Sequence, residues 1–194
     1  MRGSNYFMTY SDLLDTASRL ARPCKLLKYI GTSEDFAGVW GGAPTVSTPG
    51  EKFKHWLSID CRFIPKGIAP THGVISVFTN EADCASGLVA FDVHAKLTLS
   101  GGKPLFAHDA QSYPPPDVLS EEHQDAYIPI WQANCPLYTE EAVAVLGGWH
   151  FPWPDGDWAE LREKPLLLWT IEDSEPWVEV WGESAGFKVI QRIT

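Results

Sequence analysis

The sequence predicts an α+β fold in which a mostly antiparallel sheet is accompanied by a few short helices. Two observations point to this class. Apolar and polar residues alternate without a break from Val89 to Leu99, which is the pattern of a strand with one buried face and one wet face. Glycine turns followed by apolar strands occur in both halves of the chain, which predicts an internally duplicated β-rich unit arranged about a pseudo-two-fold axis.

The alternating stretch is the most explicit of the strand predictions. Phe91 and Val93 are expected to face the core, and His94 is expected on the polar face between Asp92 and Lys96. Because no second histidine or cysteine is close to it in the sequence, we interpret His94 as a surface residue rather than a metal ligand.

The clearest predicted helix covers residues 9–21. Thr9 and Asp12 have the spacing of a capping box, and apolar residues then recur at helical intervals until Pro23 ends the segment. This helix should be amphipathic and should lie on an apolar surface. A second, short helix is expected at 120–125.

The remaining elements are predicted from shorter signals. Two glutamates follow Thr139, where the helix dipole favours carboxylates, so a helix is expected from there towards Gly147. Residues 103–116 are expected to form a loop, because three consecutive prolines near its end favour an extended backbone. Further strands are expected in the apolar runs at 25–30, 56–60, 73–78, 166–171 and 187–190.

The duplicated unit consists of a glycine turn, a buried strand with an acidic end, another glycine and a further strand. Gly41-Gly42 opens the first copy and Gly147-Gly148 opens the second. The spacing between corresponding residues is similar, at 106 for the second glycine, 112 for the central isoleucine and 113 for the last glycine. We therefore expect one domain over residues 1–194, with repeat-like halves at about 36–108 and 139–194.

The composition fits one folded domain. The chain has 194 residues, of which 44% are apolar and 21% are charged, so it can bury a core. No apolar run approaches the roughly 20 residues that a membrane helix needs, and the first residues lack the apolar core of a signal peptide. The four cysteines are scattered and favour buried thiols over disulfides. We expect a cytoplasmic protein that does not enter a membrane.

Charge is distributed unevenly along the chain. Residues 1–108 carry 11 Lys and Arg against 9 Asp and Glu, whereas residues 109–194 carry 4 against 16, and the net charge is −10. An acidic half repels phosphates, so nucleic acid is not expected as a partner. Two interpretations stay open: a surface that attracts a basic protein partner, and a solvated acidic face that merely aids solubility.

Several segments also resemble a known family. The YwqG-like proteins, an uncharacterised bacterial family, share a Gly-Gly-aromatic turn, a Leu-Leu-Leu strand ending in an acidic residue, and a Trp-Gly-Asp-Ser-Gly segment before a last apolar strand. In this chain the corresponding segments are Gly147-Gly148-Trp149, 166–173 and 181–186. The likeness covers about half the chain, and the usual Gln of the apolar strand is missing. It implies an α+β fold with an internal duplication, and it implies no established activity.

One motif suggests catalysis. Gly182-Glu183-Ser184-Ala185-Gly186 matches the G-x-S-x-G nucleophile elbow of serine esterases. In that fold the elbow opens a helix, and an acid and a histidine follow the serine in the sequence. Here only eight residues follow Gly186, they contain no acid or histidine, and they have the pattern of a strand. We therefore expect Ser184 to serve a turn, and no catalytic residue is predicted.

No cofactor or metal is predicted. The sequence contains no G-x-G-x-x-G or Walker loop, so nucleotide binding has no support. It also lacks the HExxH and facial-triad spacings of common metal sites.

The leading functional hypothesis is a non-catalytic binding protein whose acidic C-terminal half engages a basic protein partner, for instance a toxin neutralised by an immunity-like protein. Two alternatives stay open: a small serine hydrolase that uses Ser184, and a domain that binds a small molecule between the two repeats. The nine tryptophans fit either core packing or a recognition surface. For the leading hypothesis we expect the partner-binding residues near the strand ends of the second repeat: Asp155, Asp157, Glu172, Asp173, Glu175, Trp153 and Trp177.

Overall fold

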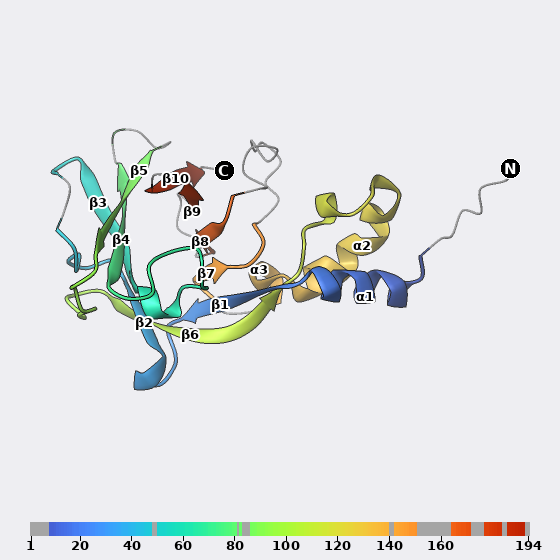
Figure 1. Ribbon diagram of the computed structural model, residues 1–194, viewed down its shortest axis with the longest axis horizontal. Helices are drawn as coiled ribbons and strands as arrows, with labels where there is room; N and C mark the ends of the chain where they lie inside the picture. Colours follow the sequence, from blue (N-terminus) through green and yellow to red (C-terminus); the bar gives the residue numbers. More distant parts are fainter. Residues whose placement is uncertain are drawn as a thin grey trace, which may run out of the picture.

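Strands dominate the molecule. The computed structural model describes residues 8–47, 50–80, 82, 86–139, 142–150, 164–171, 177–183 and 186–192. Within these residues ten strands form one sheet in the order β10-β9-β8-β7-β1-β6-β2-β3-β4-β5, and every neighbouring pair is antiparallel (Figure 1). The strands are β1 (Arg22–Lys28), β2 (Phe36–Trp40), β3 (Phe53–Asp60), β4 (Val74–Asn80), β5 (Gly87–Asp92), β6 (Lys103–Ser112), β7 (Ala144–Gly147), β8 (Leu166–Thr170), β9 (Trp177–Glu183) and β10 (Gly186–Arg192). The expected α+β class with a mostly antiparallel sheet is confirmed.

The order of the strands has a simple plan. β1 and β6 pair in the centre, and a four-stranded meander lies on either side of them, β2 to β5 on one side and β7 to β10 on the other. The sheet curls until its edge strands approach each other, so it is close to a barrel. At this seam Gln191 donates a hydrogen bond to the carbonyl of Ser86. Gly87 lies against Val189 there, so closely that a Cβ at Gly87 would overlap the valine side chain.

Two apolar cores hold the structure. The first fills the inside of the curled sheet and contains Leu105 of β6 together with Leu57, Ile75, Leu146 and other residues of both meanders. The second lies between the outer face of β1, β7, β8 and β9 and the helices. Because several strands are covered on both faces, β8 and the stretch at 142–147 have no exposed residues at all.

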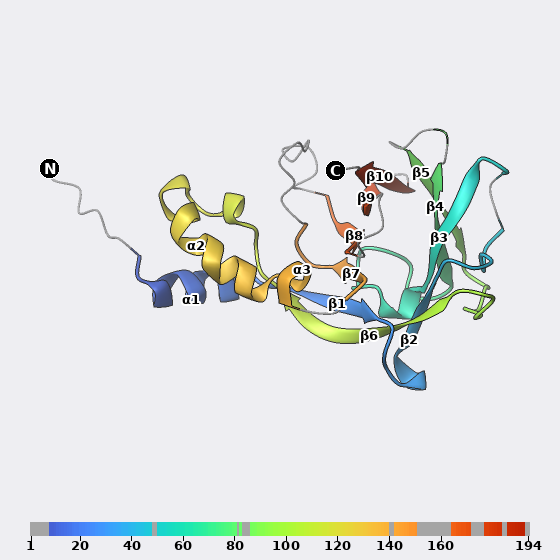
Figure 2. The same cartoon turned by 180° about the vertical axis from the view of Figure 1, so that it is seen from behind.

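The helices form a separate layer at one end of the molecule. Among the described residues they are α1 (Tyr10–Leu20), α2 (Glu121–Asn134) and the short α3 (Pro136–Thr139). The same residues include the 3-10 turns η1 (Ser33–Asp35), η2 (Cys61–Phe63) and η3 (Pro116–Val118). α1 and α2 lie side by side and run back toward the sheet from the far end (Figures 1 and 2). In the described part of the chain, no helix has the length and apolar character needed to cross a membrane.

The first helix agrees with its prediction. The Thr9 side chain accepts a hydrogen bond from the amide of Asp12, and the Asp12 carboxylate accepts one from the amide of Thr9, which completes the capping box. Leu13 and Ala17 are buried on the side that faces the second core. The second predicted helix is longer than expected and continues as α2 to Asn134.

The strand expected at 89–99 is wrong in its length. β5 ends at Asp92, and both Phe91 and Val93 are exposed, at 40% and 36%. The Asp92 carboxylate accepts a hydrogen bond from the amide of His94 at 2.8 Å, so the side chain turns the backbone. β5 is also the last strand in the order of the sheet, so residues that continued it beyond Asp92 would have a neighbouring strand of that order, β4, on one side only.

Two other segments also differ from expectation. Residues 103–112, expected in a loop, form the central strand β6, which tolerates Pro104 because that residue lies beyond the end of β1, where β6 pairs on one side only. The helix expected from Thr139 to Gly147 is replaced by β7 at its C-terminal end. Residues 142–147 are all buried, and such a short apolar run does not distinguish helix from strand by its pattern.

Candidate functional site

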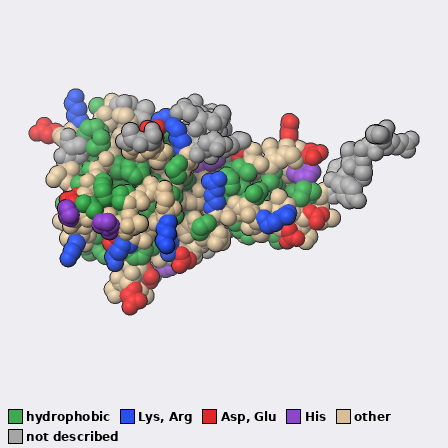
Figure 3. All heavy atoms as spheres, viewed as in Figure 1, with side chains coloured by type: hydrophobic (Ala, Val, Ile, Leu, Met, Phe, Trp, Pro, Cys, Tyr) green, Lys and Arg blue, Asp and Glu red, His purple; other side chains and the backbone are tan. Residues whose placement is uncertain are grey.

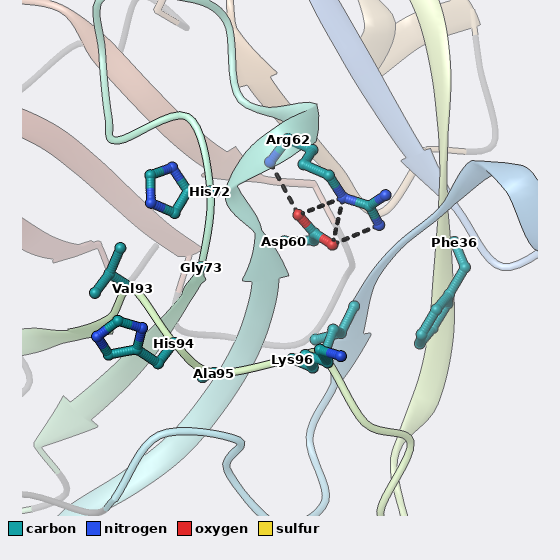
Figure 4. A pocket seen from close by; sticks show the side chains of 10 residues that line it. Phe36, Asp60, Arg62, His72, Gly73, Val93, His94, Ala95 and Lys96 are labelled. Atoms are coloured by element: carbon teal, nitrogen blue, oxygen red, sulfur yellow. Dashed lines mark hydrogen bonds and ion pairs between the residues drawn. The ribbon is translucent and has the colours of Figure 1, made fainter.

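A pocket of about 420 Å³ lies at one end of the β2–β5 meander (Figure 4). Its walls come from the start of β2, the β3–η2 junction, the residue pair before β4 and the segment after β5. The lining residues are Phe36, Asp60, Arg62, His72, Gly73, Val93, His94, Ala95, Lys96 and Leu97. Figure 4 shows His72 and His94 on one side of the pocket, Phe36 on the opposite side, and the Asp60–Arg62 pair between them.

A tight ion pair fixes the arginine of this pocket. The Arg62 Nη2 and Nε atoms donate to Asp60 Oδ2 at 2.7 and 2.9 Å, and the Arg62 backbone amide donates to Oδ1 at 2.9 Å. The Asp60 side chain is 13% exposed, whereas the Arg62 side chain is 68% exposed. The hydrogen bonds and charge of Asp60 raise the pKa of Arg62, so the guanidinium stays charged at every physiological pH.

A glycine allows the histidine side of the pocket to form. Gly73 has a φ of +97°, and a Cβ there would come within 2.5 Å of the carbonyl oxygen of Asp92 and 2.7 Å of the Cα of Val93. The chain after β5 can therefore pass directly against Gly73. The Asp92 turn then positions His94, which faces into the same pocket as His72.

The residues that line this pocket are far apart in the sequence, and no local pattern indicates that they come together. His94 is exposed, as predicted, and His72, which is distant from it in the sequence, lines the same pocket. The two residues are 22 positions apart in the sequence and are joined by the β4–β5 hairpin. Gly73 is the point at which the two segments approach each other, and glycine is typical of positions where one backbone passes close to another.

A second polar cluster lies under the loop that follows β2. Ser58 Oγ is 2.9 Å from His55 Nε2 and 2.7 Å from Ser76 Oγ, and His55 Nδ1 is 3.1 Å from the carbonyl oxygen of Gly42. A carbonyl oxygen can only accept, so Nδ1 carries the ring proton and Nε2 accepts the proton of Ser58. Thr45 donates from its backbone amide to Ser58 Oγ at 3.5 Å.

A bulge in β3 creates this cluster. Residues three apart on a regular strand point to opposite faces. The β3–β4 register shifts between His55 and Leu57, so that Trp56 is an extra residue. His55 then pairs with Phe78 and Ser58 pairs with Ser76, which places both polar side chains on the outer face of the sheet.

The cluster has the spacing of a serine nucleophile and its base, but its surroundings favour a structural role. Ser58 is 1% exposed and Ser76 is fully buried, so no substrate reaches either hydroxyl in this arrangement. Burial lowers the pKa of His55, which keeps the ring neutral at pH 7. The amide of Val46 donates to Ser76 Oγ at 3.4 Å, and together these bonds anchor the loop 41–47 on the sheet.

The described cysteines do not provide a nucleophile. Cys24, Cys61 and Cys135 are buried and reduced, as expected. Burial raises the pKa of Cys24 to about 12 and that of Cys61 to about 11, so neither forms a thiolate at neutral pH. Among the residues that the structure describes, no three His, Cys, Asp or Glu side chains converge as metal ligands would.

Another cavity, of about 470 Å³, lies between the two meanders. Gly67 and Ile68 line it from the first, and Lys164, Pro165, Gly182, Glu183 and Gly186 line it from the second. This is the region in which the small-molecule alternative places a ligand. Its two charged side chains, Lys164 and Glu183, form an ion pair at 3.1 Å across the cavity wall, so they offset each other's charge. The pocket of Figure 4 is therefore the better site for a charged ligand.

Most of the predicted partner-binding patch lies outside the described residues. This applies to Asp155, Asp157, Glu172, Asp173, Glu175 and Trp153. Trp177 is described, begins β9, and is half-buried against the second core. The other described tryptophans are likewise buried or half-buried, which agrees with the core-packing interpretation.

Ser184 also lies outside the described residues, but the strands on either side of it are described. β9 and β10 pair antiparallel, with Glu183 opposite Gly186. A nucleophile elbow requires a helix after the serine, and a strand stands there instead. This context does not favour the hydrolase alternative.

Three of the described carboxylates of the acidic half lie together on α2. Residues 109–150 contain seven Asp and Glu and no Lys or Arg. Three of the seven, Glu121, Glu122 and Asp125, are exposed in the first turns of α2. Figure 3 shows acidic side chains gathered at this helical end of the molecule.

Comparison of the sequence with models of known protein families and with curated proteins found no match. The resemblance to the YwqG-like family therefore stays a prediction.

Proposed function

We propose that the protein is a non-catalytic binding protein that engages a basic protein partner through its acidic C-terminal half, for example as an immunity protein that neutralises a toxin. The observation that carries this proposal is the stretch 109–150, which holds seven carboxylates without a single Lys or Arg. Its exposed carboxylates on α2 lie at the end of the molecule farthest from the sheet, where a partner can approach freely.

The helical end also offers apolar anchors beside the charges. Tyr10, at the start of α1, is 64% exposed, and Ile128, on α2, is 36% exposed. Interfaces commonly combine such aromatic or aliphatic anchors with a rim of charged groups. Carboxylates on this rim would attract Lys and Arg side chains and would speed the encounter with a basic partner. The predicted patch around Asp173 and Glu175 would add further negative charge to the acidic half.

The duplication is part of the same proposal. β2 to β5 and β7 to β10 are meanders of equal strand number, and a glycine pair with positive φ lies at the end of the first strand of each. Gly41 and Gly42 have φ values of 65° and 69°, and Gly147 and Gly148 have values of 70° and 79°. We propose that each meander descends from one ancestral unit. In this alignment β9, rather than β10, corresponds to β4, so the offset of 113 between Gly73 and Gly186 joins strands that are not equivalent.

Binding can be tested by charge reversal. The wild-type protein is used to capture partners from an extract of the native host, and the association rate of each is then measured at several salt concentrations. Replacing Glu122 and Asp125 together with Lys should slow association about fivefold or more, because rim charges act mainly on the association rate. Asp173→Lys with Glu175→Lys tests the predicted patch in the same way.

The matched control reverses Glu34 and Glu51, two exposed carboxylates outside the acidic half. This variant changes the net charge by the same amount and should associate at nearly the wild-type rate. Helix content is checked by circular dichroism, since a lysine near the start of α2 costs about 0.3–1 kcal/mol through the helix dipole. If the association rate ignores salt and all the reversals in the acidic half, that half is only a solvated face.

A further inference from the structure

We propose that the pocket of Figure 4 binds a small organic anion, a carboxylate or phosphate group attached to a compact apolar substituent. The site is separate from the acidic surface and does not depend on the proposed partner. Three cationic or protonatable side chains besides Arg62 line it: His72, His94 and Lys96. Together with Arg62 they come from three segments of the chain, with His94 and Lys96 on the same one, and all four are exposed.

The pocket presents positive charge although it contains a carboxylate. Asp60 lies behind Arg62 and is mostly covered, and its oxygens are already occupied by three donors from that arginine. It therefore orients the guanidinium and leaves the outer edge of that group facing solvent. An arginine held in this way is preorganised for anion binding, because its side chain loses little conformational entropy when the ligand binds.

The histidine side is equally well supported. Gly73 brings the two segments into contact, and its carbonyl oxygen accepts a hydrogen bond from the amide of Cys61 at 3.0 Å, which ties the turn that carries Arg62 to the residue beside His72. Across from them, the amide of Ala95 donates to the carbonyl oxygen of Asp92 at 3.4 Å and tightens the turn that carries His94. The backbone segments that carry Arg62, His72 and His94 are therefore held together by these contacts.

The apolar residues of the lining determine which substituent the anion can carry. Phe36 on one side and Val93 on the other, together with Leu97, give the pocket apolar lining, and Val93 is 36% exposed although it is an aliphatic residue (Figure 4). A cavity of about 420 Å³ is within the size range of small-molecule sites. The combination of apolar lining and several nitrogen donors fits a molecule with one anionic end and one apolar end.

The net charge of −10 does not prevent such binding. At physiological ionic strength the screening length is about 8 Å, so carboxylates on distant surfaces have little effect inside the pocket. Lys96 and Arg62 against Asp60 leave the lining positively charged even with both histidines neutral.

The proposal is tested with four probes that share a phenyl group: phenyl phosphate, phenylacetate, benzyl alcohol and benzylamine. Each is titrated into the isotopically labelled full chain, and amide and Arg62 Nε–H shifts are followed by NMR. One of the anions should bind at least tenfold more tightly than the alcohol and the amine, and should shift Arg62, Gly73 and Ala95. The tighter of the two anions then identifies phosphate or carboxylate as the ligand class.

Two variants locate the binding energy. Arg62→Gln should weaken the preferred anion about tenfold while retaining a donor for Asp60, and Lys96→Gln should weaken it about threefold, since an exposed charge contributes less. Lys52→Gln, which removes an exposed lysine outside the pocket, should leave the affinity unchanged. The proposal is overturned if neither anion binds better than benzyl alcohol or if the chemical-shift changes fall outside the pocket. It is also overturned if Arg62→Gln and Lys96→Gln both bind the anion like the wild type.

Discussion

Removing the hydroxyl of Ser58 should destabilise the protein, because that hydroxyl connects His55 of β3 to Ser76 of β4 within the network that anchors the loop 41–47. Its two short contacts are those to His55 Nε2 at 2.9 Å and Ser76 Oγ at 2.7 Å, while the Thr45 amide at 3.5 Å contributes little. A buried group left without its partner costs about 1–3 kcal/mol, so Ser58→Ala should lower the free energy of unfolding by about 2 kcal/mol.

Ser76→Ala breaks the same central bond and should cost about 1.5 kcal/mol for the same reason. In the double variant no hydroxyl is left facing an empty position between β3 and β4. The combined cost should therefore be about 1 kcal/mol less than the sum of the single costs, which is the size of coupling found between contacting groups.

The assay is urea denaturation followed by tryptophan fluorescence, with the midpoint and the slope both fitted. Ser33→Ala, at an exposed position of η1, serves as the control and should change the stability by less than about 0.5 kcal/mol. Single costs below about 0.5 kcal/mol, or costs that simply add, would show that the network does not hold the loop.

Two further predictions concern the same region. Gly42→Ala should cost more than Gly41→Ala, because a Cβ at Gly42 would come within 2.4 Å of the Gly102 nitrogen and the Ser100 oxygen, whereas a Cβ at Gly41 meets nothing within 4 Å. Gly41→Ala should lower the free energy of unfolding by about 1–2 kcal/mol through its positive φ alone. Gly148→Ala, whose Cβ would meet Ser112, should resemble Gly42→Ala if the two units are equivalent. Thermal denaturation checks all three variants, and equal losses for the Gly41 and Gly42 variants would contradict the packing argument. Burial lowers the folded-state pKa of His55 below its ordinary value of 6.5, so the unfolded chain binds the proton first and stability should be lost as the pH falls below about 6.5. His55→Gln should show a smaller loss than the wild type between pH 7 and pH 5 in urea denaturation, and identical pH profiles would refute this role.

Local signals predicted local structure well. The capping box of Thr9 and Asp12 determines where α1 begins, because its hydrogen bonds span only three residues. The apolar run that forms β8 was also evident, since a strand covered on both faces needs apolar residues throughout. β6 was missed because Pro104 and several polar residues weaken its pattern, and its pairing with β1 depends on residues about 80 positions away.

The candidate pocket was beyond prediction for a similar reason. His94 was correctly predicted to lie at the surface. His72 lines the same pocket only because the β4–β5 hairpin and the close approach at Gly73 bring the two segments together. The His55–Ser58 contact required a bulge at Trp56, and an unbroken strand would have separated the two side chains. The pairing register and the bulges of a strand depend on its neighbouring strands, so they cannot be predicted from the sequence of that strand alone.

The seam between β5 and β10 has a consequence for how the protein is made. The contact between Gln191 and Ser86 joins residues 105 positions apart. At a synthesis rate of 5–20 residues per second, the partner of β5 is produced roughly 5–20 s after β5 itself. During that time β5 is an open edge with unpaired backbone groups, and such edges can pair with other chains. The early turn at Asp92 keeps this edge to six residues, which limits what a neighbouring nascent chain can join before the seam is sealed.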